Sequence, residues 1–438
     1  AWNRFNHIDG WFAHTYSQIC AMSEFKDHPE LFALNDKGKP FNTALCPTHP
    51  QIIQRAKERS LAALRKHYSP QSNLISISEY DGSTGYCHCP RCEALNKKYG
   101  TPIAAHLTLV NEVARAIAPE FPDAKVTFLV YSKDFRQPPV GMHMASNVAM
   151  WYCSNDVPFE KSYEKMMQAS RQFERWRKVV DTAYVWEYCC DYSRYFRVLP
   201  TLHAKIDNLR YWQKHDVSGV MMLEVFGSPA GDQQTLRAWM LAKLLWNPSL
   251  DADALAREFC ERVFGIAADE MYAYYKLVDQ AGGQGRTVEA HYGIEAFLSQ
   301  ANALFDKALV KADAAKDQEL GHRIETQQMA ISIMELDHLF ASWPASAKRF
   351  PRQRYEALLN HVQQVTQREA MLRYSEVRSM AGRLAEWQML ADVSHTGILS
   401  VRTIDATLYE YPRFKDPLAE GGEATRLPPN DHWLVQWH

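Results

Sequence analysis

The alternation of short apolar strands with helical segments between residues 73 and 225 restricts the fold of this chain most strongly. Five segments, each rich in β-branched or aromatic residues, have the length and composition of buried strands: Leu74–Ser78, Lys125–Tyr131, Val148–Tyr152, Ala183–Tyr188 and Gly219–Val225. Strands that alternate with helices are typical of parallel βαβ units. No glycine-rich phosphate-binding turn follows the first strand, so the pattern favours an α/β fold of the (β/α) TIM-barrel type over a dinucleotide-binding sheet.

A complete barrel of this type needs three more strands than the sequence shows. The first 70 residues contain one clear helical pattern, Gln51–Lys66, and the stretch Trp11–Tyr16 fits neither a helix nor a strand well. Two alternatives follow. Either the first strands precede Ala1 and are absent from this chain, or the barrel is incomplete.

After Gly231 the apolar spacing becomes helical, and several long amphipathic stretches suggest a helical bundle. A chain of 438 residues is also long enough for more than one domain. We therefore predict a barrel catalytic domain over residues 1–265, an α-helical bundle over 266–395, and a C-terminal extension with short strands or an irregular tail over 396–438.

Composition and charge exclude several classes of function. The formal net charge is −2, from 49 Lys+Arg and 51 Asp+Glu, and no basic stripe is present, so no nucleic-acid partner is expected. The longest apolar runs, such as Val217–Val225, are too short to span a bilayer. Aromatic residues reach 12% of the chain. Most of these aromatic side chains must lie in the core. Trp and Tyr rings also stack on sugars, so the high aromatic content indicates a glycan partner.

The carboxyl ends of the five predicted strands are where a barrel enzyme carries its catalytic residues. Every one of these ends has a carboxylate, usually beside an aromatic residue: Glu79 with Asp81, Asp134, Asp156, Glu187 and Glu224. Glycosidic cleavage needs a proton donor, a group that opposes the positive charge of the transition state, and a platform for the sugar. This arrangement therefore predicts a glycosidase.

Glu79 and Asp81 form the sharpest pair among these carboxylates. Residues two apart on an extended chain point the same way, so both side chains are expected to face one substrate. Two carboxyl groups this close should titrate together, with one pKa raised into the range of a general acid. The alternative is that Asp81-Gly82 is only a turn and that Glu79 caps a helix. Glu187 and Glu224 have a similar alternative, as ion pairs at the rim of the barrel.

Three cysteines lie within six residues, at Cys87, Cys89 and Cys92. They could bind a structural zinc ion with Cys46 or His88 as the fourth ligand, or form one disulfide and leave one free thiol. Both alternatives stay open at this point. No His-x-x-x-His or His-Glu-x-x-His pattern lies on a predicted helix, so neither a catalytic metal nor another cofactor is predicted.

Several short motifs, in order from about residue 28 to 275, resemble the domain-of-unknown-function family 4838. The motifs are His28-Pro29-Glu30-Leu31-Phe32-Ala33-Leu34 with Asp36-Lys37-Gly38, Leu45-Cys46-Pro47-x-x-Pro50, Asp81-Gly82, Gly85-Tyr86-Cys87-x-Cys89-Pro90-x-Cys92, Asn111-Glu112-Val113-Ala114, Asn147-Val148, Trp186-x-Tyr188, Leu236-Arg237-Ala238 and Lys243-Leu244-Leu245-Trp246-Asn247-Pro248.

The resemblance implies a barrel related to the retaining hexosaminidases. Its characterised branch, glycoside hydrolase family 163, cleaves the chitobiose core of complex N-glycans as an endo-β-N-acetylglucosaminidase. In that class the substrate's acetamido oxygen is the nucleophile, one carboxylate orients the acetamide, and a second is general acid and then base. If the five strands are the fourth to the eighth, the Glu79–Asp81 pair lies on the fourth, where such pairs are expected. The usual order is Asp and then an adjacent Glu, whereas here Glu comes first.

These observations lead to one predicted function. We expect a retaining glycoside hydrolase for β-N-acetylglucosaminides. The resemblance also implies endo-cleavage of complex N-glycans and a secreted, periplasmic or cell-surface location. Glu79 is assigned as acid/base because its side chain reaches further, and Asp81 is assigned to the acetamide. Sugar binding is assigned to residues at the other strand ends: Tyr131, Trp151, Asn155, Trp186, Glu187 and Glu224.

Two alternatives to this function remain. One is a glycosidase for another sugar, such as a glucuronide, whose carboxylate would need an arginine that no strand end clearly offers. The other is a catalytically degenerate barrel that only binds carbohydrate.

Overall fold

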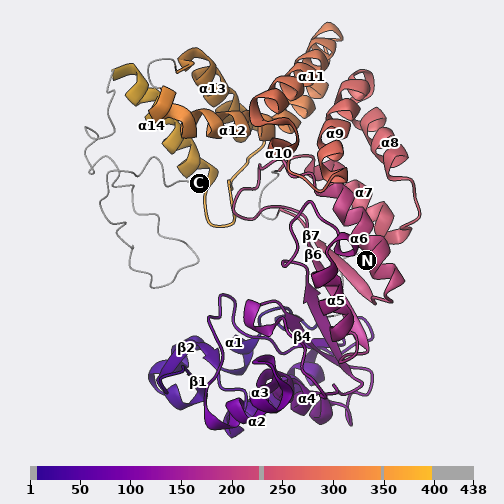
Figure 1. Ribbon diagram of the computed structural model, residues 1–438, viewed down its shortest axis with the longest axis vertical. Helices are drawn as coiled ribbons and strands as arrows, with labels where there is room; N and C mark the ends of the chain where they lie inside the picture. The colour runs from indigo at the N-terminus through magenta and orange to yellow at the C-terminus, as the bar shows by residue number, and fades with distance from the viewer. Residues whose placement is uncertain (1–6, 226–230, 347–349, 397–438) are drawn as a thin grey trace. The chain divides into compact units, whose positions relative to one another are not determined.

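The computed structural model describes residues 7–225, 231–346 and 350–396 (Figure 1). Within them the chain forms two compact units. The first comprises the described residues of Ala1–Cys189, Ala204–Leu223 and Lys243–Ser249. The second comprises those of Cys190–His203, Glu224–Ala242 and Leu250–His438. Two short segments before residue 243 therefore belong to the second unit.

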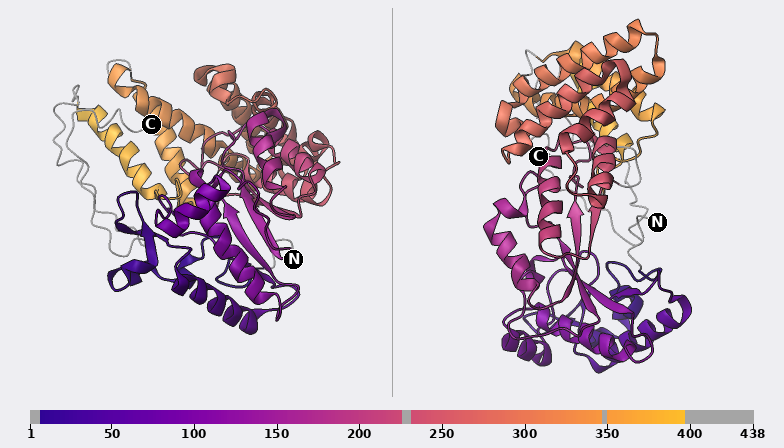
Figure 2. Two further views of the ribbon diagram at one scale, coloured as in Figure 1. Left: turned by 60° about the horizontal axis from the view of Figure 1, so that its bottom comes forward. Right: turned by 90° about the vertical axis from the view of Figure 1, so that its right-hand side faces the viewer.

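A five-stranded parallel sheet forms the centre of the first unit, in the order β3-β4-β5-β6-β7. The strands are β3 (Leu74–Ser76), β4 (Lys125–Val130), β5 (Val148–Cys153), β6 (Thr182–Tyr188) and β7 (Gly219–Leu223). They coincide with the five predicted strands and occur in the predicted order, so the α/β class with parallel βαβ units is confirmed. The sheet curls as half of a barrel (Figure 2), and it does not close into eight strands within the described residues.

An irregular N-terminal segment, residues 7–16, lies along the edge of β3 that no regular strand occupies. The Ile8 N–H donates to the Leu74 carbonyl at 2.9 Å, and the Ser76 N–H donates to the Trp11 carbonyl at 3.0 Å. The Thr15 N–H continues the pairing with the Ser78 carbonyl at 3.2 Å. The stretch whose pattern fitted neither helix nor strand therefore satisfies backbone groups at the sheet edge.

Helices that cover the sheet come from the segments before and between its strands. They include α2 (Pro50–His67), α4 (Ile103–Ile117), α5 (Met167–Trp176) and α6 (Leu202–Lys214). The predicted apolar face of α4 is fully buried at Leu109, Val110, Val113 and Ile117. This spacing of three and four residues places the four side chains on one side of the helix, where they join the main core.

Two elements of the first unit were not predicted from the sequence. One is an antiparallel hairpin of β1 (Phe32–Leu34) and β2 (Pro40–Leu45). The other is α3 (Pro90–Tyr99), which begins at a proline and ends before Gly100, whose φ of +73° suits a helix C-terminus. Both pack in a small separate core of alanine and cysteine side chains.

The second unit is helical in its described part (Figures 1 and 2). Its helices are α7 (Gln234–Trp246, whose last residues lie in the first unit), α8 (Ala252–Phe264), α9 (Ala268–Gly283), α10 (Val288–Tyr292), α11 (Ile294–Ala314), α12 (Gln318–Ser346), α13 (Arg352–Arg368) and α14 (Met380–Thr396). Helices α11 to α14 pack consecutively, which confirms a helical C-terminal region. The predicted extension over 396–438 lies outside the described residues beyond Thr396. No helix in the described part of the chain is long and apolar enough to cross a membrane.

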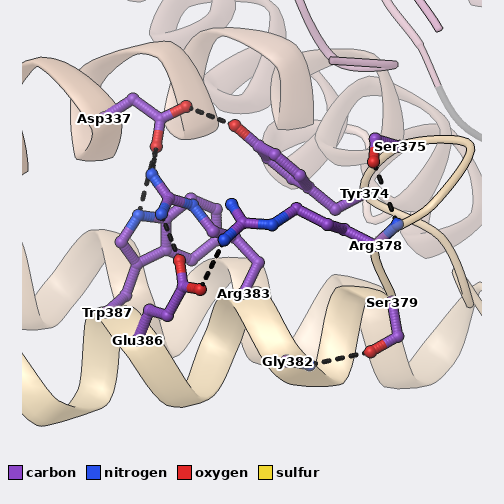
Figure 3. A network of polar contacts seen from close by, with 9 residues as sticks. All are labelled: Asp337, Tyr374, Ser375, Arg378, Ser379, Gly382, Arg383, Glu386 and Trp387. Carbon is purple, nitrogen blue, oxygen red and sulfur yellow. Dashed lines mark hydrogen bonds and ion pairs between the residues drawn. The ribbon is translucent and has the colours of Figure 1, made fainter. Parts of the chain in front are cut away.

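A buried polar network joins α12 to α14 (Figure 3). The Arg383 guanidinium forms ion pairs with Asp337 and Glu386. Asp337 also accepts hydrogen bonds from the Tyr374 hydroxyl at 2.8 Å and from the Trp387 ring N–H at 3.2 Å. Burial acts to lower the pKa of Arg383, but Asp337, Tyr374 and Glu386 together outweigh it and the pKa is raised. The arginine therefore stays charged inside the bundle.

Candidate active site

Glu79 lies just beyond the carboxyl end of β3, where the backbone still pairs with β4 through the Ile77 N–H and the Thr127 carbonyl at 2.8 Å. Its side chain is almost fully buried, with 4% exposed. Neither carboxyl oxygen has a hydrogen-bond partner among the described residues. Burial raises the pKa of Glu79 to about 7, and the charge of Asp81 adds to this effect. A carboxyl group in this state holds its proton near neutral pH.

His14 connects Glu79 with Asp81 from the N-terminal segment. Its Nδ1 lies 2.8 Å from the Glu79 carbonyl oxygen, which can only accept, so this nitrogen carries the hydrogen. Its Nε2 lies 3.5 Å from Asp81 Oδ1. The imidazole therefore fixes the backbone of one carboxylate residue and faces the side chain of the other.

Asp81 and Glu79 occupy different environments, although both were predicted to face one substrate. The Asp81 side chain is 80% exposed, and its Oδ1 accepts the Gly82 N–H at 3.0 Å. Gly82 has φ +68°, so the Asp81-Gly82 turn proposed as an alternative is present. The raised pKa expected for one member of the pair falls on Glu79, and its main cause is burial rather than the neighbouring carboxylate.

A pocket opens beside Glu79, and its lining includes the polar side chains of Tyr16, Asn96 and His106. The Tyr16 hydroxyl lies 2.7 Å from His106 Nδ1. Burial lowers the pKa of His106 to about 4, so this ring is neutral at physiological pH. Burial and then the charge of Glu79 raise the pKa of Tyr16 well above its usual value. Neither His106 nor Tyr16 therefore offers a positive charge to the Glu79 carboxyl group.

Aromatic side chains cover one face of the sheet near these strand ends. Along β6, Tyr184, Trp186 and Tyr188 are half-buried while the residues between them are buried, as strand alternation requires. Phe12 stacks on Trp186 with ring centroids 5.3 Å apart. The Trp186 ring N–H has no hydrogen-bond partner among the described residues. These half-exposed rings offer an apolar platform for a sugar.

Tyr131 and Trp151, the other predicted sugar-binding aromatics, differ in exposure. Tyr131 is half-buried and packs edge-on against His14 with centroids 5.5 Å apart. Trp151 is fully buried, and it packs against Phe12 at 5.8 Å and Tyr184 at 5.0 Å. Trp151 therefore packs beneath the rings of Phe12 and Tyr184, and it is too buried to contact a ligand.

The ends of β3, β4, β5 and β6 come together in the first unit. Burial raises the pKa of the Cys153 thiol to about 12, and the nearby charge of Glu79 contributes to the rise. Burial, followed by the proximity of Cys153 and Tyr131, raises the pKa of Tyr188. Arg136 donates to the carbonyl oxygens of Tyr131 at 3.1 Å and Cys153 at 2.7 Å, which holds the ends of β4 and β5 in place.

Glu187 was predicted to bind sugar, but it lies on the helix-covered face of β6, opposite Trp186. It is completely buried. Four protein donors occupy its two oxygens: Lys205 at 2.8 Å, Ser154 at 2.8 Å, Trp212 at 2.8 Å and Asn208 at 3.0 Å. This placement leaves no oxygen for a ligand, and it corresponds to the ion-pair alternative.

Glu224 and Asn155 are the remaining predicted sugar ligands. Glu224 belongs to the second unit, where the Arg237 guanidinium binds both of its oxygens, at 2.5 Å and 2.9 Å. This also matches the ion-pair alternative. Asn155 is exposed in the turn that follows β5.

Four cysteines could hold a metal ion close to the Glu79 pocket. The sulfur atoms of Cys46, Cys87, Cys89 and Cys92 all lie within 4.8 Å of one another. His88, which was considered as a fourth ligand, instead pairs with Glu93 at 2.8 Å. Cys87 also lines the pocket beside Glu79.

Sequence reasoning missed four residues that shape the site: His14, Tyr16, His106 and Arg136. The first two lie in the segment whose pattern was ambiguous, and only its pairing with β3 brings them to the strand end. His106 stands on the buried face of α4, where a histidine among apolar residues was the available signal.

The chain matches the family described as "Domain of unknown function (DUF4838)" over residues 2–276. It belongs to the DUF4838 family. The matched region of this DUF4838 protein contains Glu79, Asp81 and all four clustered cysteines.

Comparison with curated proteins gives no match. Among solved structures, the DUF4838 chain is similar to a glycoside hydrolase family 138 enzyme that targets the pectin rhamnogalacturonan II, with a TM-score of 0.38 and 6% sequence identity. The alignment covers 88% of this chain, which spans 65% of the length of that enzyme.

Proposed function

We propose that this protein is a retaining glycoside hydrolase for β-N-acetylglucosaminides, with Glu79 as its general acid and base. The observation that carries the proposal is the state of Glu79: buried at a strand end, without a partner, and with a pKa raised to about 7. A glycosidase needs a carboxylic acid that is still protonated at working pH. Structural carboxylates are normally paired when buried, as Glu187 is here.

Asp81 supplies the second carboxylate of the proposed reaction. Its exposed side chain is free to accept the N–H of the substrate's acetamido group, and the Gly82 N–H holds its orientation. It lies two positions after Glu79 along the chain, so their backbones lie within about 7 Å. A pair this close beyond one strand end is suited to reach the glycosidic oxygen and the 2-acetamido group of the same sugar.

The proposed chemistry has two steps. Glu79 donates its proton to the glycosidic oxygen while the acetamido oxygen attacks the anomeric carbon, which releases the leaving group and forms a cyclic oxazolinium ion. The Glu79 carboxylate then removes a proton from a water molecule that opens this ring. Both steps invert the anomeric carbon, so the product keeps the β configuration.

The half-exposed rings of Tyr131, Trp186 and Tyr188 support sugar binding in this proposal. The resemblance to glycoside hydrolase family 163 extends it to endo-cleavage of complex N-glycans by a secreted, periplasmic or cell-surface protein. A glucuronide hydrolase and a binding protein without activity are the competing outcomes of the test.

The test compares three substrates: an intact N-glycoprotein, an aryl β-N-acetylglucosaminide, and the matching aryl β-glucoside with a 2-hydroxyl group. We expect turnover only where the acetamido group is present, because it is the nucleophile. Proton NMR should detect the β anomer first, and a thiazoline analogue of the cyclic intermediate should inhibit. An α anomer as first product, or equal turnover of the glucoside, would rule out this mechanism. Binding without turnover would favour the binding protein, and turnover of an aryl glucuronide alone would favour the other hydrolase.

A further inference from the structure

We infer that Cys46, Cys87, Cys89 and Cys92 bind one structural zinc ion. All four side chains are buried, and their sulfur atoms lie within 4.8 Å of one another. Cys46 Sγ is 3.6 Å from Cys89 Sγ and 3.9 Å from Cys92 Sγ. Tetrahedral zinc with Zn–S bonds of about 2.3 Å places its sulfurs about 3.8 Å apart. A disulfide needs about 2.05 Å.

Hydrogen-bond donors directed at the sulfurs supply a second observation. The Thr48 hydroxyl lies 3.1 Å from Cys92 Sγ, and it is also near Cys46 and Cys89. The Leu34 N–H donates to Cys87 Sγ at 3.4 Å. Donors of this kind stabilise thiolates and orient them for a metal, as outer groups do in known zinc sites.

The core around the cluster explains why an ion would be needed there. Besides the four cysteines, its buried members are only the small side chains of Ala33, Ala44 and Ala105. This small core offers little apolar surface of its own, and a structural metal is a common substitute in such elements. Four soft thiolates in this arrangement select zinc or iron, and zinc is the usual occupant of structural four-cysteine sites.

The positions of the ligands connect this site with the pocket at Glu79. Cys46 follows β2, Cys87 and Cys89 belong to the loop between β3 and α3, and Cys92 is in the first turn of α3. The same loop contributes Ser83, Gly85 and Tyr86 to the pocket lining. Zinc would therefore hold one wall of the pocket without taking part in the reaction.

The experiment measures metal in the full chain, purified without chelators from zinc-supplemented medium. We expect one zinc ion per chain by elemental mass spectrometry, and X-ray absorption at the zinc edge should show four sulfur neighbours at about 2.3 Å. A mercurial that blocks thiols should release the zinc. These readouts are independent of glycosidase activity, so failure of the proposed function would leave them unchanged.

Substitutions provide the matched comparison. Cys89→Ser and Cys46→Ser should lose most of the bound zinc, whereas Cys20→Ser, which changes a buried thiol outside the cluster, should keep one equivalent. If the ligand variants fail to fold, the stoichiometry and absorption spectrum of the unaltered protein still decide. A folded protein without zinc, with iron in its place, with a disulfide among these residues, or with four readily alkylated thiols would overturn the inference.

Discussion

At the scale of the residue, three buried or half-buried glutamates at strand ends differ in the partners that their environments provide. Glu187 receives four protein hydrogen bonds, and Glu224 is bound by Arg237 through both oxygens. Glu79 is buried without such partners, and burial raises its pKa to about 7. Only the last can exchange a proton near neutral pH without disrupting an ion pair.

The raised pKa of Glu79 makes stability depend on pH. The folded protein holds this proton more tightly than the unfolded chain, whose pKa is near 4.5, so the stability of the folded state falls as pH rises from about 4.5 to about 7. Glu79→Gln removes this loss. At pH 8 the variant should be more stable than the unaltered protein by up to about 3 kcal/mol, and at pH 4.5 the two should be similar.

Asp81→Asn is the control for this prediction, because the side chain is exposed and should change stability little at either pH. Denaturant unfolding at both pH values gives the comparison. If Glu79→Gln is less stable than the unaltered protein at pH 8, the carboxylate has a stabilising partner and is structural.

The sequence allowed the Glu79–Asp81 pair to be located because both residues directly follow an apolar run. It did not reveal that one is buried and the other exposed, since this depends on His14 and on the turn at Gly82. Trp186 and Glu187 show the same limit. Their neighbouring positions in a strand end place them on opposite faces of the sheet, so only one can face a substrate.

At the scale of the element, the strands of the sheet were predictable because each is a short apolar run between helical patterns. The β1–β2 hairpin and α3 were not, since they are short and most of their buried apolar side chains are alanine and cysteine, with Phe32 and Leu45 as the large exceptions. Residues 7–16 were not predicted because their pairing with β3 is irregular. A segment that pairs irregularly shows no regular alternation of apolar and polar residues in its sequence.

The network between α12 and α14 gives a prediction for the helical unit (Figure 3). Arg383→Ala should destabilise it by about 3 kcal/mol, because the Asp337 carboxylate would lose its cationic partner and Glu386 would keep only Arg378. Arg354→Ala is the matched control: this arginine is half-exposed beside Glu335, and its loss should cost less than about 1 kcal/mol. Tryptophan fluorescence during denaturant unfolding measures both. Similar losses for the two variants would contradict the structural role of the network.

At the scale of the whole molecule, the two units are interleaved along the chain. Residues 190–203 and 224–242 belong to the helical unit although they lie between parts of the first. The DUF4838 match, residues 2–276, likewise extends through the sheet and into α9. The proposed catalytic residues, the half-exposed aromatic rings and the cysteine cluster all belong to the first unit. The proposed activity is therefore assigned to that unit.

The central claim, that Glu79 is the general acid, is tested most directly by the leaving-group dependence of Glu79→Gln. The measurement is kcat/KM for an unactivated β-N-acetylglucosaminide and for its dinitrophenyl counterpart, whose leaving group needs no proton. We predict a loss of about 10²–10⁴-fold on the first substrate and a much smaller loss on the second. The fall in the activity of the unaltered enzyme as pH rises through about 7 should also disappear in the variant. Equal losses on both substrates, or near-full activity on the unactivated one, would contradict the account.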